Sequence, residues 1–186
     1  MLDVTSKPPV NGIDIQALGE TVEAVKADPP LGRVGFRVRT EWKGQTRSKS
    51  EVESYTIAGN QVPRRFTIAA AEPIELLGTN QAPNPQELLM TAVNACMMVG
   101  YVAQAAIRGI TLDECVIATD GELDLRGFLG IDDSVPAGYE RIDYAVTLRG
   151  DGTREQYEEI HRAVMATSPN YFNLARPIRM NGRLAD

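Results

Sequence analysis

Residues 84–109 are nearly all apolar or small beyond their first turn, and they predict one long helix. Asn84 is a suitable N-cap, and Pro85 suits the first helical position because its missing N–H needs no partner there. Gly109 favours the left-handed conformation that ends many helices. Between these ends no wide polar face remains, so we expect the helix to be buried on most of its sides.

The same helix contains many Ala and Gly residues, which allow another backbone to approach closely. A second copy of the helix is the neighbour that we expect. Asn94, Gly100, Tyr101 and Gln104 interrupt the apolar run, and both of its ends are capped. These interruptions argue against a membrane-spanning segment, so we expect no membrane partner.

Composition narrows the class of protein. A chain of 186 residues, 43% of them hydrophobic, predicts one domain or one domain with an extension. The net charge of -6 argues against nucleic-acid binding. The first residues do not resemble a secretion signal, which predicts a cytoplasmic protein. The two cysteines, Cys96 and Cys115, make neither a metal cluster nor a disulfide framework, so we expect no metal and no cofactor.

The N-terminal part is predicted to be an extension, residues 1–32, ahead of the main domain, residues 33–186. Residues 1–12 are rich in proline and polar groups, and we expect irregular chain. Ile15, Leu18, Val22 and Val25 recur at helical spacing, which predicts an amphipathic helix over residues 14–27. Its narrow apolar stripe needs a docking surface, on its own subunit or on a partner.

The rest of the chain alternates between strand and helix patterns. We expect a second helix at residues 154–167, followed by a short helical turn that ends near residue 175. A β-bulge is predicted near Gly121. Strands are expected at residues 33–42, 47–57, 64–70, 111–125, 142–148 and 178–184. This order predicts an α+β fold with antiparallel pairing.

Four short motifs carry a family resemblance. They are NPQELL at residues 84–89, Ala95-Cys96, GELD at residues 121–124 and ATSP at residues 166–169. In this combination, residues 34–184 resemble the OsmC/Ohr family of osmotically induced and organic hydroperoxide resistance proteins. The resemblance implies antiparallel sheets wrapped around a long central buried helix, in an intertwined homodimer with its sites at the interface.

The resemblance also implies a role for Cys96. In peroxidase members of the family, a mid-helix cysteine attacks a hydroperoxide, and a second cysteine just before a proline resolves the product. Here the second position is Ser168, which cannot form a disulfide. The sequence therefore predicts a branch without the resolving cysteine, in which an external thiol reductant restores Cys96.

A reactive Cys96 must be a thiolate, and the helix dipole helps little so far from the helix start. A cation is therefore needed. The resemblance implies an arginine held by a glutamate: Arg65, which precedes Phe66, or Arg47. Gln86 stands where the family has that glutamate, with Glu87 next to it.

Several side chains are candidates for an apolar pocket around Cys96, although core packing is the simpler explanation for them. These predicted binding residues are Met97, Tyr101, Ser168, Tyr171 and Phe172. Cys96 itself has a simpler interpretation as a small buried core residue. His161 is expected to be a solvated side chain on the outer side of its helix.

The sequence thus predicts an OsmC-like, cysteine-based hydroperoxide reductase that acts on organic hydroperoxides with an external thiol. One alternative is a non-catalytic protein of the same fold that binds a small apolar ligand at the dimer interface. A further alternative is an interaction module that docks through the helix at residues 14–27.

Overall fold

A computed structural model describes residues 8–185 of the chain, which divides into two compact units between Leu89 and Met90. Residues 1–7, part of the predicted irregular segment, lie outside the described residues. Just after them, Val10 and Ile13 form an isolated antiparallel bridge. The predicted domain boundary after residue 32 stays a prediction.

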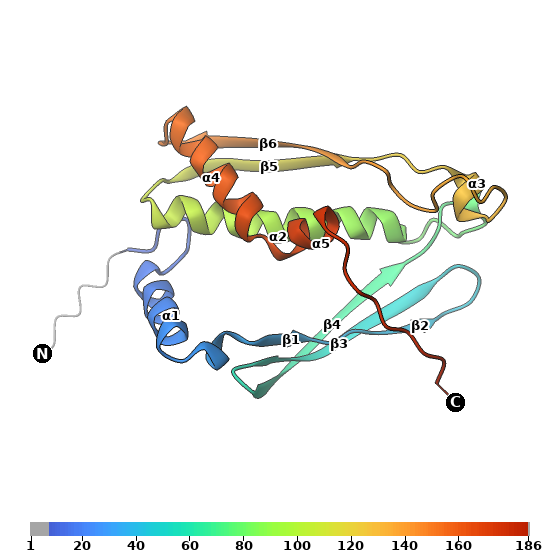
Figure 1. Ribbon diagram of the computed structural model, residues 1–186, viewed down its shortest axis with the longest axis horizontal. Helices are drawn as coiled ribbons and strands as arrows, with labels where there is room; N and C mark the ends of the chain where they lie inside the picture. The colour runs from blue at the N-terminus through green and yellow to red at the C-terminus, as the bar shows by residue number, and fades with distance from the viewer. Residues whose placement is uncertain (1–7, 186) are drawn as a thin grey trace, which may run out of the picture. The chain divides into compact units, whose positions relative to one another are not determined.

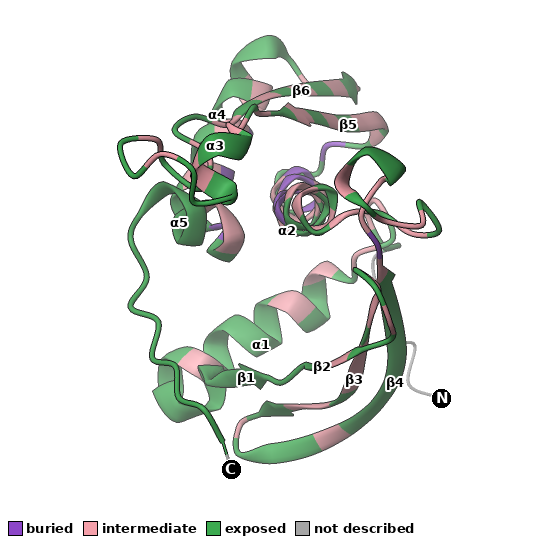
Figure 2. Ribbon diagram, turned by 90° about the vertical axis from the view of Figure 1, so that its right-hand side faces the viewer, coloured by how far each residue is buried: buried purple, intermediate pink, exposed green. Residues whose placement is uncertain are grey.

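The first unit begins with the predicted amphipathic helix. Asp14 caps it by accepting a hydrogen bond from the Ala17 amide at 3.0 Å, and Asp28 ends it. No residue of this helix is buried (Figure 2). The elements of this unit are α1 (Ile15–Ala27), η1 (Pro29–Gly32), β1 (Val34–Phe36), β2 (Arg39–Trp42), β3 (Ser48–Ile57), β4 (Asn60–Ala70) and η2 (Ile74–Leu76).

The sheet of the first unit is organised around β3. Both β1 and β2 pair antiparallel with one edge of β3, and β4 pairs antiparallel with the other edge (Figure 1). The predicted strand at residues 33–42 is therefore split in two. The turn before β3 contains Gly44 at a φ of 91°, a conformation that glycine adopts without strain.

The second unit contains most of α2 (Pro85–Ile107), the long predicted helix, whose first turn belongs to the first unit. A hairpin of two antiparallel strands follows, and then two further helices, at nearly the predicted positions. These elements are β5 (Leu112–Asp120), α3 (Leu125–Phe128), β6 (Asp143–Gly150), α4 (Arg154–Thr167) and α5 (Pro169–Ala175). The α+β class is confirmed.

The bulge predicted near Gly121 is wrong. β5 ends at Asp120, and its register irregularity lies at the other end, between Leu112 and Glu114. Gly121 has another role, because a Cβ added there would lie 3.1 Å from the ring of Tyr139. The glycine therefore makes room for an aromatic side chain after the strand has ended.

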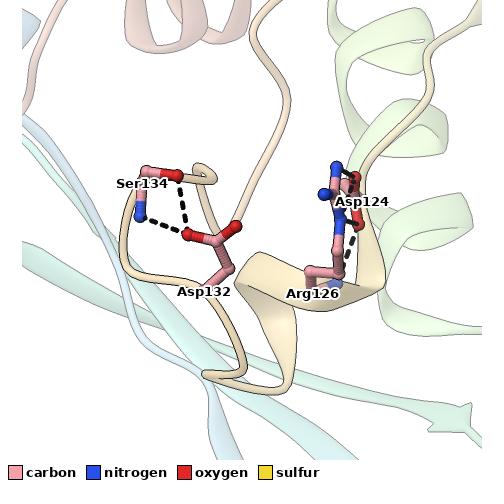
Figure 3. Close-up of polar contacts among 4 residues, drawn as sticks. All are labelled: Asp124, Arg126, Asp132 and Ser134. Carbon is pink, nitrogen blue, oxygen red and sulfur yellow. Dashed lines mark hydrogen bonds and ion pairs between the residues drawn. The ribbon is translucent and has the colours of Figure 1, made fainter.

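The segment after β5 contains the short helix α3. Asp124 caps this short helix by accepting from the Arg126 amide at 2.8 Å, and its carboxylate also binds the Arg126 guanidinium (Figure 3). Further along, Asp132 accepts from the amide and the hydroxyl of Ser134, at 2.9 and 2.6 Å. Local side-chain bonds therefore order this loop.

The closing strand predicted at residues 178–184 is also wrong, because no strand is assigned there within the described chain. Ile178 is 58% exposed and Met180 is 91% exposed. A strand needs an edge that satisfies its backbone hydrogen bonds. An alternating apolar pattern therefore does not form a strand unless another strand lies beside it.

The core of the second unit lies along one stripe of α2. Val93, Met97, Tyr101 and Ala105 recur every fourth residue, so they share one helix face, and all are buried (Figure 2). The opposite side carries Val99, which is 69% exposed. Within the second unit, α2 is therefore buried on one face rather than on most sides.

Gly100 allows α4 to approach α2 closely. A Cβ at this position would lie 3.2 Å from both terminal methyl groups of Val164. The close neighbour at this small residue is therefore a helix of the same chain.

Among the described residues, α2 is long and apolar enough to cross a membrane by length and composition alone. Core helices of globular proteins pass the same test. Two of its polar interruptions, Asn94 and Tyr101, bond to groups of the same chain. That α2 is not a membrane span stays a prediction.

Replacing Ile160 by alanine is expected to lower the free energy of unfolding by about 2–5 kcal/mol, because it leaves a cavity in a fully buried part of the core. Urea denaturation would measure this loss. The matched control is Ile131→Ala, at a side chain that is 69% exposed, with an expected change below about 0.5 kcal/mol. Equal losses in both variants would contradict the assigned core.

Candidate functional site

Cys96 lies in the middle of α2 and is a half-buried free thiol. The hydroxyl of Ser168 donates a hydrogen bond to its sulfur at 3.5 Å. Ser168 is only 5% exposed. The structure therefore brings together the two residues that the resemblance pairs, and the second of them is a serine.

The junction of α4 and α5 positions Ser168. Its amide donates to the Val164 carbonyl at 2.8 Å, which ends α4, and its hydroxyl accepts from the Tyr171 amide at 3.5 Å, which caps α5. Asn170 then donates from its side chain to the Ala92 carbonyl on α2 at 2.9 Å. Two side chains of this junction thus contact α2 within one turn of Cys96.

Asn94 ties the same part of α2 to β5. Its side-chain oxygen accepts from the Thr119 hydroxyl at 2.6 Å, and its amide donates to the Ile117 carbonyl at 3.4 Å. Sequence reasoning treated Asn94 only as an interruption of the apolar run. The usable signal was that a polar side chain in an apolar helix needs hydrogen-bond partners when it is buried.

The predicted binding residues lie in different environments. Met97 and Tyr101 are fully buried in the core, which favours packing. Tyr171 is half-buried and meets the ring of Tyr144 edge-on. Phe172 is 53% exposed. Ser168 is the member of this predicted set with a hydrogen bond to Cys96.

The two candidate arginines belong to the first unit. Arg65 is an exposed residue of β4. Arg47 lies in the turn before β3 and is half-buried, and its Nε is buried without a hydrogen-bond partner among the described residues. An unpaired buried donor is costly, so a hydrogen-bond acceptor beside the Arg47 Nε would be stabilising. Which arginine serves Cys96 stays a prediction.

Gln86 and Glu87 lie in the first turn of α2. The Asn84 side chain accepts from both of their amides at 2.9 Å, and the Glu87 carboxylate accepts from the Asn84 amide at 2.8 Å. Glu87 is therefore engaged in a capping box. Sequence reasoning missed Glu72, whose carboxylate accepts from the Asn84 side-chain amide at 3.2 Å.

The prediction for His161 is wrong. It is half-buried, and its Nδ1 is bonded to the hydroxyl of the fully buried Tyr101 at 2.5 Å. His161 follows Ile160 of the inner stripe, so it lies at the edge of that stripe rather than on the outer side of α4. The sequence signal that could have predicted this contact was Tyr101, because a buried tyrosine hydroxyl needs a hydrogen-bond partner.

Burial also affects Cys115 and Tyr101. It raises the pKa of the Cys115 thiol, and it raises the pKa of the Tyr101 hydroxyl well above its usual range. Both groups are therefore neutral at pH 7. Within residues 8–185, no group of three or more His, Cys, Asp or Glu side chains is arranged to hold a metal ion.

Cys115 is expected to resist alkylation in the folded protein, because its raised pKa keeps it in the unreactive thiol form. Iodoacetamide treatment of Cys96→Ser at pH 7, followed by intact mass measurement, would test this. The same variant in denaturant should be fully alkylated. Rapid labelling of the folded protein would contradict the expectation.

Comparison with known proteins places the chain in a family. The model for OsmC-like protein matches residues 78–181, more than half of the chain. The chain therefore belongs to the OsmC-like family. A comparison with curated protein sequences gives no match.

Solved structures agree on the fold. An OsmC-like protein from Mycoplasma pneumoniae matches with a TM-score of 0.59 and 14% identity, covering 75% of this chain and 86% of that one. A protein from Psychrobacter arcticus, described as an osmotic stress induced and detoxification response protein, matches with a TM-score of 0.55 and 14% identity over 72% and 84% of the two chains. An OsmC-like protein of unknown function from Vibrio cholerae matches with a TM-score of 0.51 and 14% identity over 73% and 90% of the two chains.

Proposed function

We propose that this protein is a thiol-dependent peroxidase that reduces organic hydroperoxides through Cys96 and an external thiol. The observation that carries the proposal is the contact between the Cys96 sulfur and the Ser168 hydroxyl at 3.5 Å. A half-buried thiol with a hydroxyl donor beside it suits a cysteine that cycles through thiolate and sulfenic acid. Membership of a family that includes hydroperoxide resistance proteins supports the same chemistry.

In the proposed reaction the Cys96 thiolate attacks one peroxide oxygen, and the O–O bond breaks. The other oxygen leaves as an alkoxide and takes a proton to become the alcohol. Cys96 is then a sulfenic acid. An external thiol attacks its sulfur to release water and form a mixed disulfide, and a second external thiol releases reduced Cys96 and the external disulfide. The Ser168 hydroxyl can donate to the sulfur throughout the cycle.

The external thiol is needed because Ser168 cannot form a disulfide with Cys96. Cys115 is a poor substitute, since burial favours its neutral thiol. The branch without a resolving cysteine is therefore part of the proposal.

We favour Arg47 over Arg65 as the cation for Cys96, because its buried Nε is unpaired within the described chain whereas Arg65 is exposed. In this role the guanidinium stabilises the thiolate and the leaving oxygen. Gln86 or Glu87 would orient the arginine, and the engagement of Glu87 in the helix cap leaves Gln86 as the freer of the two.

We also propose a homodimer in which a second copy covers the open side of α2. Val99 and Ile107 are 69% and 53% exposed on this helix. Covering such apolar side chains would stabilise the assembly. We also propose a cytoplasmic location, because reduced thiols that could restore Cys96 are kept available there.

Reduced protein treated with a small excess of cumene hydroperoxide is expected to gain one oxygen at Cys96, detected by intact mass and by a sulfenic-acid trap. Cys96→Ser should not react, whereas Cys115→Ser should react like the unmodified protein. Arg47→Gln should slow the reaction more than Arg65→Gln does. If Cys96 stays reduced while thiols in solution are consumed, the peroxidase proposal fails, and the protein is better studied as a binder of apolar ligands.

Ser168→Cys is expected to create an internal disulfide with Cys96, because the replaced oxygen lies 3.5 Å from the sulfur and a small rotation brings two sulfurs to bonding distance. The experiment uses a Cys115→Ser background and one equivalent of hydroperoxide. Loss of both free thiols and of two hydrogen atoms in the mass would confirm the bond. Persistence of two thiols after peroxide is consumed would show that the geometry is unsuitable.

A further inference from the structure

A cavity lies within the second unit, away from the Cys96–Ser168 contact. It has a volume of about 930 Å³ and opens between α4 and β6, and neither Cys96 nor Ser168 lines it. Sites for small ligands usually measure about 300–1,000 Å³. The cavity is therefore large enough for a small molecule.

One wall of the cavity is apolar and aromatic. Tyr144, Val146 and Leu148 all line it, and they lie on one face of β6 because side chains along a strand point to opposite sides in turn. Tyr157 adds a second ring from α4. The apolar wall, half-buried throughout, consists of Ile142, Tyr144, Val146, Leu148 and Tyr157. Such a wall suits a flat or ring-shaped ligand.

The polar end of the cavity depends on Tyr101 and His161. Tyr101 is fully buried, and its hydroxyl lies 2.5 Å from Nδ1 of His161. The phenol has one hydrogen and no other hydrogen-bond partner in the described chain, so the pairing that satisfies it is donation to Nδ1, with an imidazole proton on Nε2. In that tautomer Nε2 has no partner among the described residues. His161 therefore offers a hydrogen-bond donor to the cavity that it lines.

The charges around the cavity leave one cation unpaired. Asp143 pairs with Arg141 at 2.7 Å, and Glu158 pairs with Arg154 at 3.1 Å. Arg162 also lines the cavity and forms no ion pair within residues 8–185. His161 and Arg162 both line the cavity, so two donors, one of them cationic, are available there.

We propose that this cavity binds a small aromatic carboxylate, with its ring against Tyr144 and Tyr157 and its carboxylate accepting from His161 Nε2 and the Arg162 guanidinium. Charge complementarity and the aromatic wall select this chemistry over a cation or a purely apolar ligand. Tyr101 is a positioning residue, because it fixes the imidazole tautomer without meeting the ligand.

His161 is the only histidine of the 186-residue chain, so its ring nitrogens can be observed without ambiguity by NMR in untagged, full-length protein. The free protein should show the Nε2–H tautomer. Tyr101→Phe should weaken this preference. Adding 2-naphthoate should shift the Nε2 signal and report one site per chain.

Calorimetric titration with 2-naphthoate measures the affinity. Arg162→Gln is expected to weaken binding by about 10–100-fold, the loss typical of a hydrogen bond to a charged group. Arg149→Gln is the matched control: it removes the same charge from β6 outside the cavity, where Arg149 pairs with Glu114 at 2.8 Å, and should leave the affinity nearly unchanged. The neutral alcohol 2-naphthylmethanol should bind at least about tenfold more weakly than the carboxylate.

Three results would overturn the proposal. They are absence of 2-naphthoate binding, equal affinity for the alcohol, and equal effects of Arg162→Gln and Arg149→Gln. Because neither Cys96 nor peroxide enters this test, its outcome is independent of the peroxidase proposal.

Discussion

The packing of α4 against one stripe of α2 is the interaction on which the second unit depends. Ile160 and Val164 of α4 are fully buried in the same cluster as Met97 and Tyr101 of α2. Gly100 makes this possible, because any side chain there would press against Val164. The same contact sets where α4 ends, and therefore where Ser168 meets α2.

Two polar clusters lie along that packed interface. At one, the end of α4 places Ser168 beside Cys96 and Asn170 against the α2 backbone. At the other, Tyr101, which lies one turn after Met97 on α2, is hydrogen-bonded to His161 of α4. In both cases a polar group at the edge of an apolar core finds its partner on the facing helix. Most buried polar groups are paired in this way, because an unpaired one is costly.

Patterns within single elements predicted much of the fold. The spans of α1, α2 and α4 follow from apolar spacing together with local caps such as Asn84 and Asp14, which depend on near neighbours in sequence. The strand expected at residues 178–184 failed because pairing requires an edge that no local pattern describes. The prediction for His161 was wrong for a related reason. This residue lies at the border between two faces of α4, and its hydrogen bond to Tyr101, sixty residues away in sequence, makes it half-buried.

For the candidate site, sequence alone identified Cys96, the family resemblance and the serine at position 168, because these depend on residue type and order. The distance between Cys96 and Ser168, the bonds that hold Asn94 and the tautomer of His161 required the folded chain, since each joins residues distant in sequence. The cavity beside α4 could not be predicted in the same way, because its wall comes from β6 and its donors from α4. Residue types specify which groups are present, and packing specifies which of them meet.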